Sequence, residues 1–99
     1  MKTTIPTHIL RGSGLYDSRN RLIACARGQD IFDVNNRRVA TMRGNELFDS
    51  NYLKMMTIDG SDILDAGKKK VAIVSDVQKH LKGSDPGMLS AAFWYCFVR

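Results

Sequence analysis

Four aspartates recur at a constant interval of 16 residues, so the same carboxylate stands in four successive segments of the chain. If the segments are related by four-fold symmetry, the carboxylates form a ring, and hard cations such as Ca²⁺ bind through carboxylate oxygens. Aspartate also starts turns, because its side chain accepts hydrogen bonds from the backbone N–H groups that follow it. Ser, Val or Ala comes next, then Arg, Asn or Gly. We therefore predict turn capping rather than a metal site for Asp17, Asp33, Asp49 and Asp65.

Basic residues follow these aspartates and form a second set of candidate functional groups. If the four segments are related by symmetry, the cations fall on one rim, which could bind nucleic acid or another polyanion. The formal net charge of +5 permits such a partner without requiring it. Tyr52 is the only aromatic residue in these turns, so base stacking has little support. The candidate anion-binding residues are Arg19, Arg21, Arg37, Arg38, Lys54, Lys68, Lys69 and Lys70.

Three further arginines stand beside glycines at the same interval, and an aspartate takes the fourth place. These residues are Arg11, Arg27, Arg43 and Asp59. The three cations could bind an anion together, or Asp59 could pair with an adjacent arginine. A solvated or ion-paired strand end is the simpler interpretation, and we favour it.

Catalytic chemistry has little support in this chain. His8 and His80 have no acid or nucleophile beside them in a recognised pattern, and Ser13 in RGSGL does not match the GxSxG motif. Cys25 occupies a column otherwise filled by Thr and Ile, which is typical of a packed strand position. Groups that repeat four times also lack the unlike partners that catalysis needs. The sequence predicts no enzyme, no catalytic residue, no cofactor and no resident metal.

An internal repeat positions all these groups. Gly12, Gly28, Gly44 and Gly60 stand 16 residues apart, and the apolar columns keep the same register. A short fixed period marks units that cannot bury their apolar faces alone, so the repeats must pack together. The columns are Leu15, Ile31, Leu47 and Ile63; Tyr16, Phe32, Phe48 and Leu64; Ile23, Val39, Met55 and Val71; and Ala24, Ala40, Met56 and Ala72.

Each unit contains two short apolar runs and two turn signals. The recurring glycine indicates a positive φ, and the aspartate starts the second turn. The unit is therefore strand, turn, strand, turn, and residues 7–74 should form about eight or nine short antiparallel strands. Residues 7–11 align with residues 39–43 at the same period, so the chain begins within a repeat.

We predict a mainly β fold in which four two-stranded repeats close around a pseudo-four-fold axis. Closure would remove the open edges of the sheet. A short β-solenoid is the alternative. Neighbouring columns are both apolar, so apolar side chains point to both faces of the strands, and one face needs a cover.

The apolar segment 88–98 is the candidate cover. Residues 84–86, Ser-Asp-Pro, form a helix-start signal, and the segment is apolar almost all round, as in a buried helix. A final strand is the alternative, since aromatic residues also favour strands. The segment could pack on its own chain or dock with a second copy. The candidate self-association residues are Phe93, Trp94, Tyr95 and Phe97, and residues 75–87 are predicted to be a linker or short helical turn.

The motif RGxx[IL][FY]D, repeated in register, resembles the bacterial 4-fold beta flower family over residues 7–74. The last unit departs from it, because Asp59 replaces the arginine and Leu64 replaces the aromatic residue. The resemblance implies a small pseudo-symmetric β module of bacterial or phage origin, and it implies no activity. The matching residues are Arg11-Gly12, Leu15-Tyr16-Asp17, Arg27-Gly28, Ile31-Phe32-Asp33, Arg43-Gly44 and Leu47-Phe48-Asp49.

The composition fits one soluble globular domain over residues 1–99, with 43% hydrophobic and 25% charged residues. Cys25 and Cys96 lack metal-binding spacing, and free thiols fit a reducing cytoplasm. The longest apolar run is shorter than the roughly 20 residues that a spanning helix needs, and no signal peptide precedes it. We predict a cytoplasmic, non-enzymatic binding or structural module that self-associates or binds another protein. A polyanion or nucleic-acid binder is the alternative.

Overall fold

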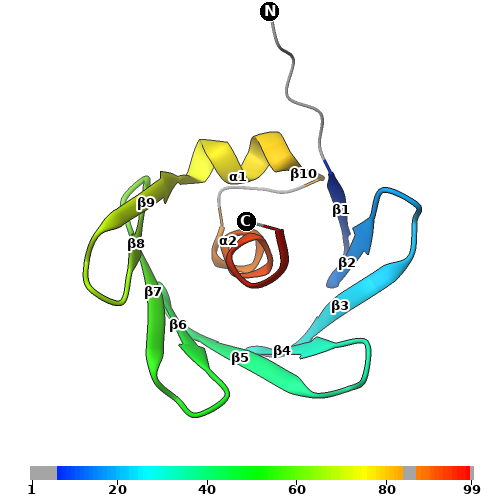
Figure 1. The fold of residues 1–99 in the computed structure, drawn as a ribbon, viewed down its shortest axis with the longest axis horizontal. Helices are drawn as coiled ribbons and strands as arrows, with labels where there is room; N and C mark the ends of the chain where they lie inside the picture. Colours follow the sequence, from blue (N-terminus) through cyan, green and yellow to red (C-terminus); the bar gives the residue numbers. More distant parts are fainter. Residues whose placement is uncertain (1–6, 84–86, 99) are drawn as a thin grey trace, which may run out of the picture.

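The computed structural model describes residues 7–83 and 87–98, and within them the fold is mainly β (Figure 1). Ten strands form one sheet, in which each strand from β1 to β9 pairs antiparallel with its neighbour in sequence. Strand β10 pairs in parallel with β1. The strands are β1 (His8–Arg11), β2 (Gly14–Asp17), β3 (Leu22–Arg27), β4 (Asp30–Asp33), β5 (Arg38–Arg43), β6 (Glu46–Asp49), β7 (Lys54–Asp59), β8 (Asp62–Asp65), β9 (Lys70–Ile73) and β10 (Leu81–Lys82).

The sheet is not closed, and this corrects the predicted ring of strands. Among the described residues β9 forms no ladder with β10 or β1, and helix α1 (Val74–His80) spans the opening between the two edges (Figure 1). Val77 of α1 is 1% exposed and Leu81 of β10 is fully buried, so apolar packing fills the gap in place of strand pairing. The antiparallel meander also differs from the alternative of a β-solenoid.

Glycine turns join the first strand of each hairpin to the second. Between β1 and β2 the two central residues are Gly12 and Ser13, and the glycine has a φ of 58°. A positive φ at the first central residue is the pattern of a type II′ turn, whose twist suits the flanking strands. The carbonyl of Ser13 also accepts a hydrogen bond from the N–H of Ala26 at 2.8 Å. The equivalent turns repeat both features, so each one shapes its own hairpin and ties it to the next.

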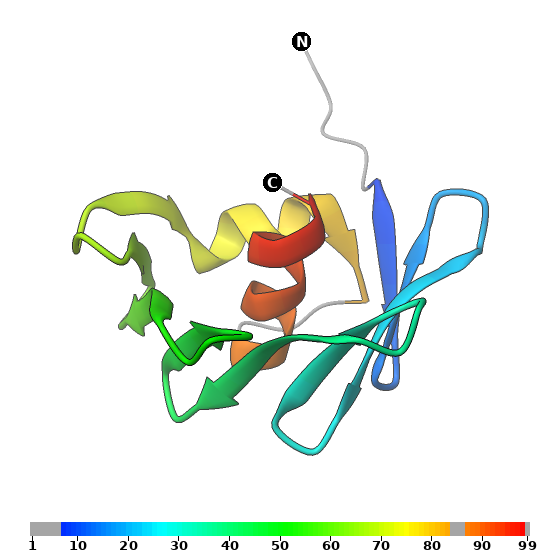
Figure 2. The same ribbon diagram turned by 60° about the horizontal axis from the view of Figure 1, so that its bottom comes forward.

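A β-bulge recurs at the same place in every unit. In the first unit Leu15 pairs with Ala24 while Tyr16 pairs with Leu22, so Ile23 is the extra residue. A bulge bends its strand and increases the local twist. Four bulges in register therefore help the sheet to curve around a central helix (Figure 2).

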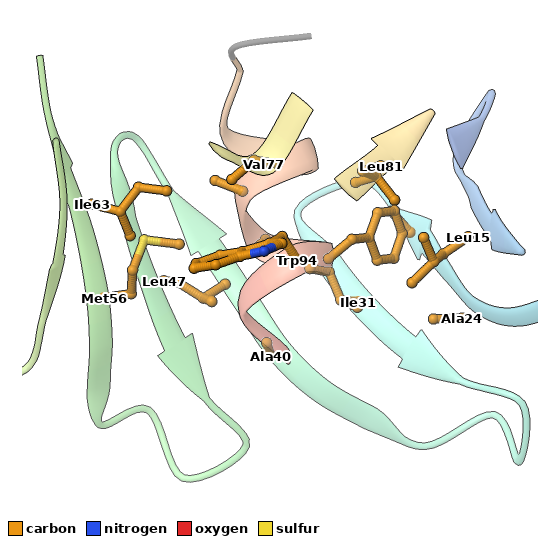
Figure 3. Close-up of a cluster of buried hydrophobic side chains, with 14 residues drawn as sticks. Leu15, Ala24, Ile31, Ala40, Leu47, Met56, Ile63, Val77, Leu81 and Trp94 are labelled. Atoms are coloured by element: carbon orange, nitrogen blue, oxygen red, sulfur yellow. The ribbon is translucent and has the colours of Figure 1, made fainter. Parts of the chain in front are cut away.

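The concave face of the sheet carries the core. One aliphatic column is fully buried in every unit, and the small side chains of Ala24 and Ala40 in the paired column leave room for the large side chains of the helix. Figure 3 shows these side chains converging on the central helical segment. The fully buried column is Leu15, Ile31, Leu47 and Ile63.

The C-terminal segment is helical, as predicted, and it packs within its own chain. Helix α2 (Met88–Phe93) continues into the π-helical turn η1 (Trp94–Val98), and the sheet surrounds both (Figures 1 and 2). The helix-start signal at residues 84–86 lies outside the described residues. The C-terminal helical segment of the same chain therefore covers the apolar concave face of the sheet.

Residues 75–87, predicted as a linker or short helical turn, contain most of α1 and all of β10. The N–H of Ile73 donates to the carboxylate of Asp76 at 3.1 Å, which satisfies a donor at the start of the helix. Gly83 follows β10 with a φ of +83°, and a Cβ there would lie 2.5 Å from the carbonyl oxygen of Leu10. Only glycine allows the chain to pass β1 so closely.

Candidate functional site

The hairpin turns after β2, β4, β6 and β8 are each capped by an aspartate side chain. In the first turn, Asp17 Oδ1 accepts hydrogen bonds from the backbone N–H groups of Arg19 and Arg21, both at 2.9 Å. The other three turns repeat this pair of bonds at 2.8–3.0 Å. Three positions after each aspartate a residue has a φ of 63–67°. These left-handed residues are Asn20, Asn36, Tyr52 and Lys68.

The four aspartates do not assemble into a ring of ligands. Their turns project away from the central helix in different directions (Figure 1). Across residues 7–83 and 87–98 no group of three or more His, Cys, Asp or Glu side chains could hold a metal ion. One oxygen of each carboxylate already accepts two N–H donors. This geometry is that of turn capping.

Asp17 has an additional partner. Arg21 Nε lies 2.9 Å from Asp17 Oδ2, so the guanidinium and the backbone N–H of Arg21 bind different oxygens of the same carboxylate. The backbone hydrogen bond from Arg21 is the main cause that lowers the pKa of Asp17 below its usual value of 3.8, and burial opposes it. The Arg21 side chain and the N–H of Arg19 lower the pKa further. Asp17 therefore holds its charge most firmly when its turn is folded.

The basic residues proposed as an anion-binding rim lie in or beside these four turns, which Figure 1 shows at the periphery of the molecule. Three of the eight are paired with carboxylates, which reduces their capacity to attract an anion. The pairs are Arg21–Asp17 at 2.9 Å, Lys54–Glu46 at 2.9 Å and Lys70–Asp62 at 3.5 Å.

Arg38 is engaged by a neighbouring turn. Its guanidinium carbon lies 4.4 Å from the centroid of the Tyr52 ring, and the group donates hydrogen bonds to the Tyr52 hydroxyl and, at 3.2 Å, to the carbonyl of Ser50. The turn between β4 and β5 is thereby linked to the turn between β6 and β7. Four of the eight rim cations are exposed and form no ion pair among the described residues: Arg19, Arg37, Lys68 and Lys69.

Two of the three arginines beside the glycines, Arg11 and Arg27, stack on aromatic rings of the same unit. The guanidinium carbon of Arg11 lies 4.4 Å from the Tyr16 ring centroid, and that of Arg27 lies 4.1 Å from the Phe32 ring centroid. Such cation–π contacts are attractive at exposed sites. Each guanidinium also donates a hydrogen bond to an amide oxygen of the following turn, from Asn20 and Asn36 respectively.

These contacts explain why no common arginine cluster forms. Arg11 and Arg27 are each held by their own unit. In the described part of the chain Asp59 forms no ion pair with an arginine. The predicted alternatives, a shared anion site or an Asp59–arginine pair, are therefore not assembled in this structure.

The fourth unit differs from the first two at all three contact positions. Asp59 takes the place of the arginine, Leu64 that of the ring and Lys68 that of the asparagine. These three residues line a cavity of about 270 Å³, which we call the fourth-unit cavity. The remaining lining residues are Asn45, Glu46, Lys54 and Thr57.

The sequence contained a signal for this cavity. The departures at Asp59 and Leu64 stand out against the repeat, but their meaning depends on a stacked arginine and ring that only the structure reveals. Asn45 and Thr57 carry no comparable signal, because they come close to Asp59 through the pairing of three strands.

The histidines and cysteines are dispersed. His8 Nδ1 lies 2.8 Å from the hydroxyl of Thr7, and His80 Nδ1 lies 2.8 Å from the backbone carbonyl of Asp76. Cys25 and Cys96 are half-buried, and no disulfide joins them. Within the described residues no hydrogen bond joins either histidine to a carboxylate side chain.

The C-terminal aromatic residues contribute to the core. Phe93 is fully buried and Trp94 is 8% exposed, while Tyr95 and Phe97 are half-buried. The Phe93 and Phe97 ring centroids are 6.4 Å apart. In this structure Phe93 and Trp94 leave almost no surface for a partner, so self-association through this segment would rest on Tyr95 and Phe97.

Comparisons with protein-family models, curated proteins and solved structures found no match for this chain. The resemblance to the 4-fold beta flower family therefore stays a prediction. Among the described residues no helix has the length and apolar character needed to cross a bilayer.

Proposed function

We propose that this protein is a non-enzymatic binding module whose exposed turn cations contact a polyanion such as nucleic acid. The observation that carries the proposal is the set of four turn cations that form no ion pair within the described chain. They are Arg19, Arg37, Lys68 and Lys69. Their backbones are fixed by aspartate caps, so binding an anion costs little further ordering of the chain.

The finer description of the fold is part of the same proposal. Recurrent bulges, glycine turns and aspartate caps at an interval of 16 residues support four related units about a pseudo-four-fold axis. The same features support membership of the 4-fold beta flower family and, with it, a bacterial origin. The two cysteines, which form no disulfide, support a cytoplasmic location. They support binding rather than catalysis, since the repeated groups are alike.

Retention on immobilised heparin tests the polyanion proposal with two matched variants. One variant, Arg19→Ser/Arg37→Ser/Lys69→Ser, removes three cations that form no ion pair. The control, Arg21→Ser/Lys54→Ser/Lys70→Ser, removes three paired cations, and both lower the formal net charge from +5 by three, to +2. We expect the first variant to elute at clearly lower salt than the control, because each lost contact with an anionic group removes counterion release that favours binding. Equal elution of the two variants would contradict the proposal.

Self-association is the second candidate function, and exposed apolar residues on two neighbouring turns favour it. Val34 is 60% exposed and Leu53 is 64% exposed, and the Arg38–Tyr52 contact holds the two turns together. Light scattering on a sizing column should then show a dimer or larger assembly that dissociates in Val34→Ser/Leu53→Ser. A monomer at every protein concentration would exclude this candidate.

A further inference from the structure

The fourth-unit cavity carries charges where two other units hold an arginine side chain. We propose that it binds a small zwitterion of the arginine type, whose guanidinium group contacts Asp59 and whose carboxylate contacts Lys68. A free arginine and the C-terminal arginine of a peptide both present this chemistry. The inference does not depend on the polyanion proposal.

The strand register places the cavity at the guanidinium position of the other units. Leu64 pairs with Thr57 across β7 and β8, and Phe32 occupies the equivalent place across β3 and β4, where Arg27 covers its ring. In the fourth unit Asp59 stands where Arg27 stands in the second. This unit lacks both the cation and the ring, and a cavity of about 270 Å³ lies between the residues that replace them.

The charges that line the cavity select a ligand with both signs. Lys54 Nζ lies 2.9 Å from Glu46 Oε2, so these two side chains neutralise each other. Asp59 and Lys68 form no ion pair in the described part of the chain, which leaves one carboxylate and one ammonium group for a ligand. A zwitterion complements both, whereas a singly charged molecule meets one like charge.

The neutral lining residues fit the same ligand. The Asn45 side-chain N–H₂ donates to the carbonyl of Ile58 at 2.8 Å, so its Oδ1 can accept from a guanidinium, as Asn20 and Asn36 do in the other units. Leu64 offers an apolar wall for a methylene chain. The volume lies below the roughly 300–1,000 Å³ of typical small-molecule sites, which favours one amino acid over a larger ligand.

Nuclear magnetic resonance titration of the full chain with L-arginine tests the proposal. We expect saturable amide shifts at Thr57, Leu64 and Lys68. Agmatine lacks the carboxylate and acetate lacks the guanidinium, so each should bind at least about tenfold more weakly through loss of one charge-assisted contact. A peptide ending in arginine and its C-terminally amidated form distinguish the two sources, since only the free carboxylate should bind.

Three variants and one control variant locate the binding. Asp59→Asn and Lys68→Gln should each weaken L-arginine binding by about tenfold. The control Asp62→Asn changes a carboxylate of the same hairpin that pairs with Lys70 outside the cavity lining, and it should bind normally. Asp59→Arg/Leu64→Phe recreates the arginine and the ring of the second unit and should abolish binding by filling the cavity, in a chain that remains folded by circular dichroism.

Several results would overturn the proposal. These are no shift with either L-arginine or the peptide, agmatine binding as tightly as L-arginine, or equal weakening by Asp62→Asn and Asp59→Asn. The heparin variants leave Asp59 and Lys68 intact, so failure of polyanion binding and failure of this site are separate results.

Discussion

Equivalent positions of the repeat differ in burial and in neighbours between the concave face and the outer face of the sheet. On the concave face, four equivalent aliphatic residues are all fully buried against a single helix. On the outer face, the residues that follow them are half-buried, and the residue before the turn glycine changes from arginine to aspartate in the fourth unit. The concave set is Leu15, Ile31, Leu47 and Ile63, and the outer set is Tyr16, Phe32, Phe48 and Leu64.

The difference follows from what each face contacts. Concave side chains from all units share the helix, so a change in one unit must be absorbed by a close-packed core. The contacts between arginine, ring and asparagine on the outer face stay within a unit, as with Arg27, Phe32 and Asn36. One unit can therefore change its outer contacts without disturbing the others, and the fourth unit has done so.

The largest expected effect compares two leucines on opposite faces. Leu47→Ala should lower the free energy of unfolding by about 2–5 kcal/mol, because the residue is fully buried and its loss leaves a cavity. Leu64→Ala, at a half-buried outer position, should cost about 1 kcal/mol. Urea denaturation of both variants measures the difference. Equal losses would show that the outer face is as tightly packed as the concave one.

The next effect concerns the glycine turns that both faces depend on. Gly44 has a φ of +61°, and a Cβ added there would meet no heavy atom within 4 Å. Gly44→Val should therefore cost more than about 1 kcal/mol through backbone strain alone. Gly67 lies in a turn without a left-handed φ, and Gly67→Ala serves as the control. If Gly44→Val were no more destabilising than Gly67→Ala by thermal unfolding, the turn would not require glycine.

A smaller effect is expected at the opposite turns. Asp49→Ala should destabilise by about 1 kcal/mol, because the N–H groups of Asn51 and Leu53 lose their acceptor. Asp49→Asn keeps an oxygen acceptor and should retain part of this stability. Chemical denaturation distinguishes the two variants, and unchanged stability in Asp49→Ala would contradict the capping role.

The smallest effect is a pH dependence at Asp17. Its folded pKa is lowered, so its contribution to stability is present above the unfolded value of 3.8 and is lost as the pH falls through the lower folded value. Asp17→Asn should therefore flatten the acid end of the stability curve. Arg21→Gln should flatten it only in part, since it keeps the backbone hydrogen bond that lowers the pKa most. If the stability of Asp17→Asn decreased at acid pH as steeply as that of the unchanged protein, this role of the Asp17 pKa would be contradicted.

Much of the fold could be predicted because each turn and strand pattern occurs four times at the same interval. Glycine and aspartate columns mark the two turns, and the apolar run at 88–98 marks a buried helix. The open edge could not be predicted, since it depends on how far the sheet curves before α1 and β10 meet it. No local pattern encodes that accumulated curvature.

The candidate sites were predictable to different degrees. The turn cations follow from turn exposure, but their pairing depends on distances such as Lys54 to Glu46 across two strands. The fourth-unit cavity could not be found from Asp59 and Leu64 alone. Finding the cavity requires the contact between Arg27 and Phe32, and the spacing of these residues in the sequence does not reveal that contact.

The position of the helix in the chain determines when the protein can fold. All ten strands precede Met88, so during synthesis the whole sheet emerges before the segment it surrounds. A nascent sheet would expose Leu15 and its equivalents to water and to other chains, a condition that favours aggregation and chaperone binding. We therefore expect the sheet to reach its stable packing only after the helical segment that it surrounds has been made.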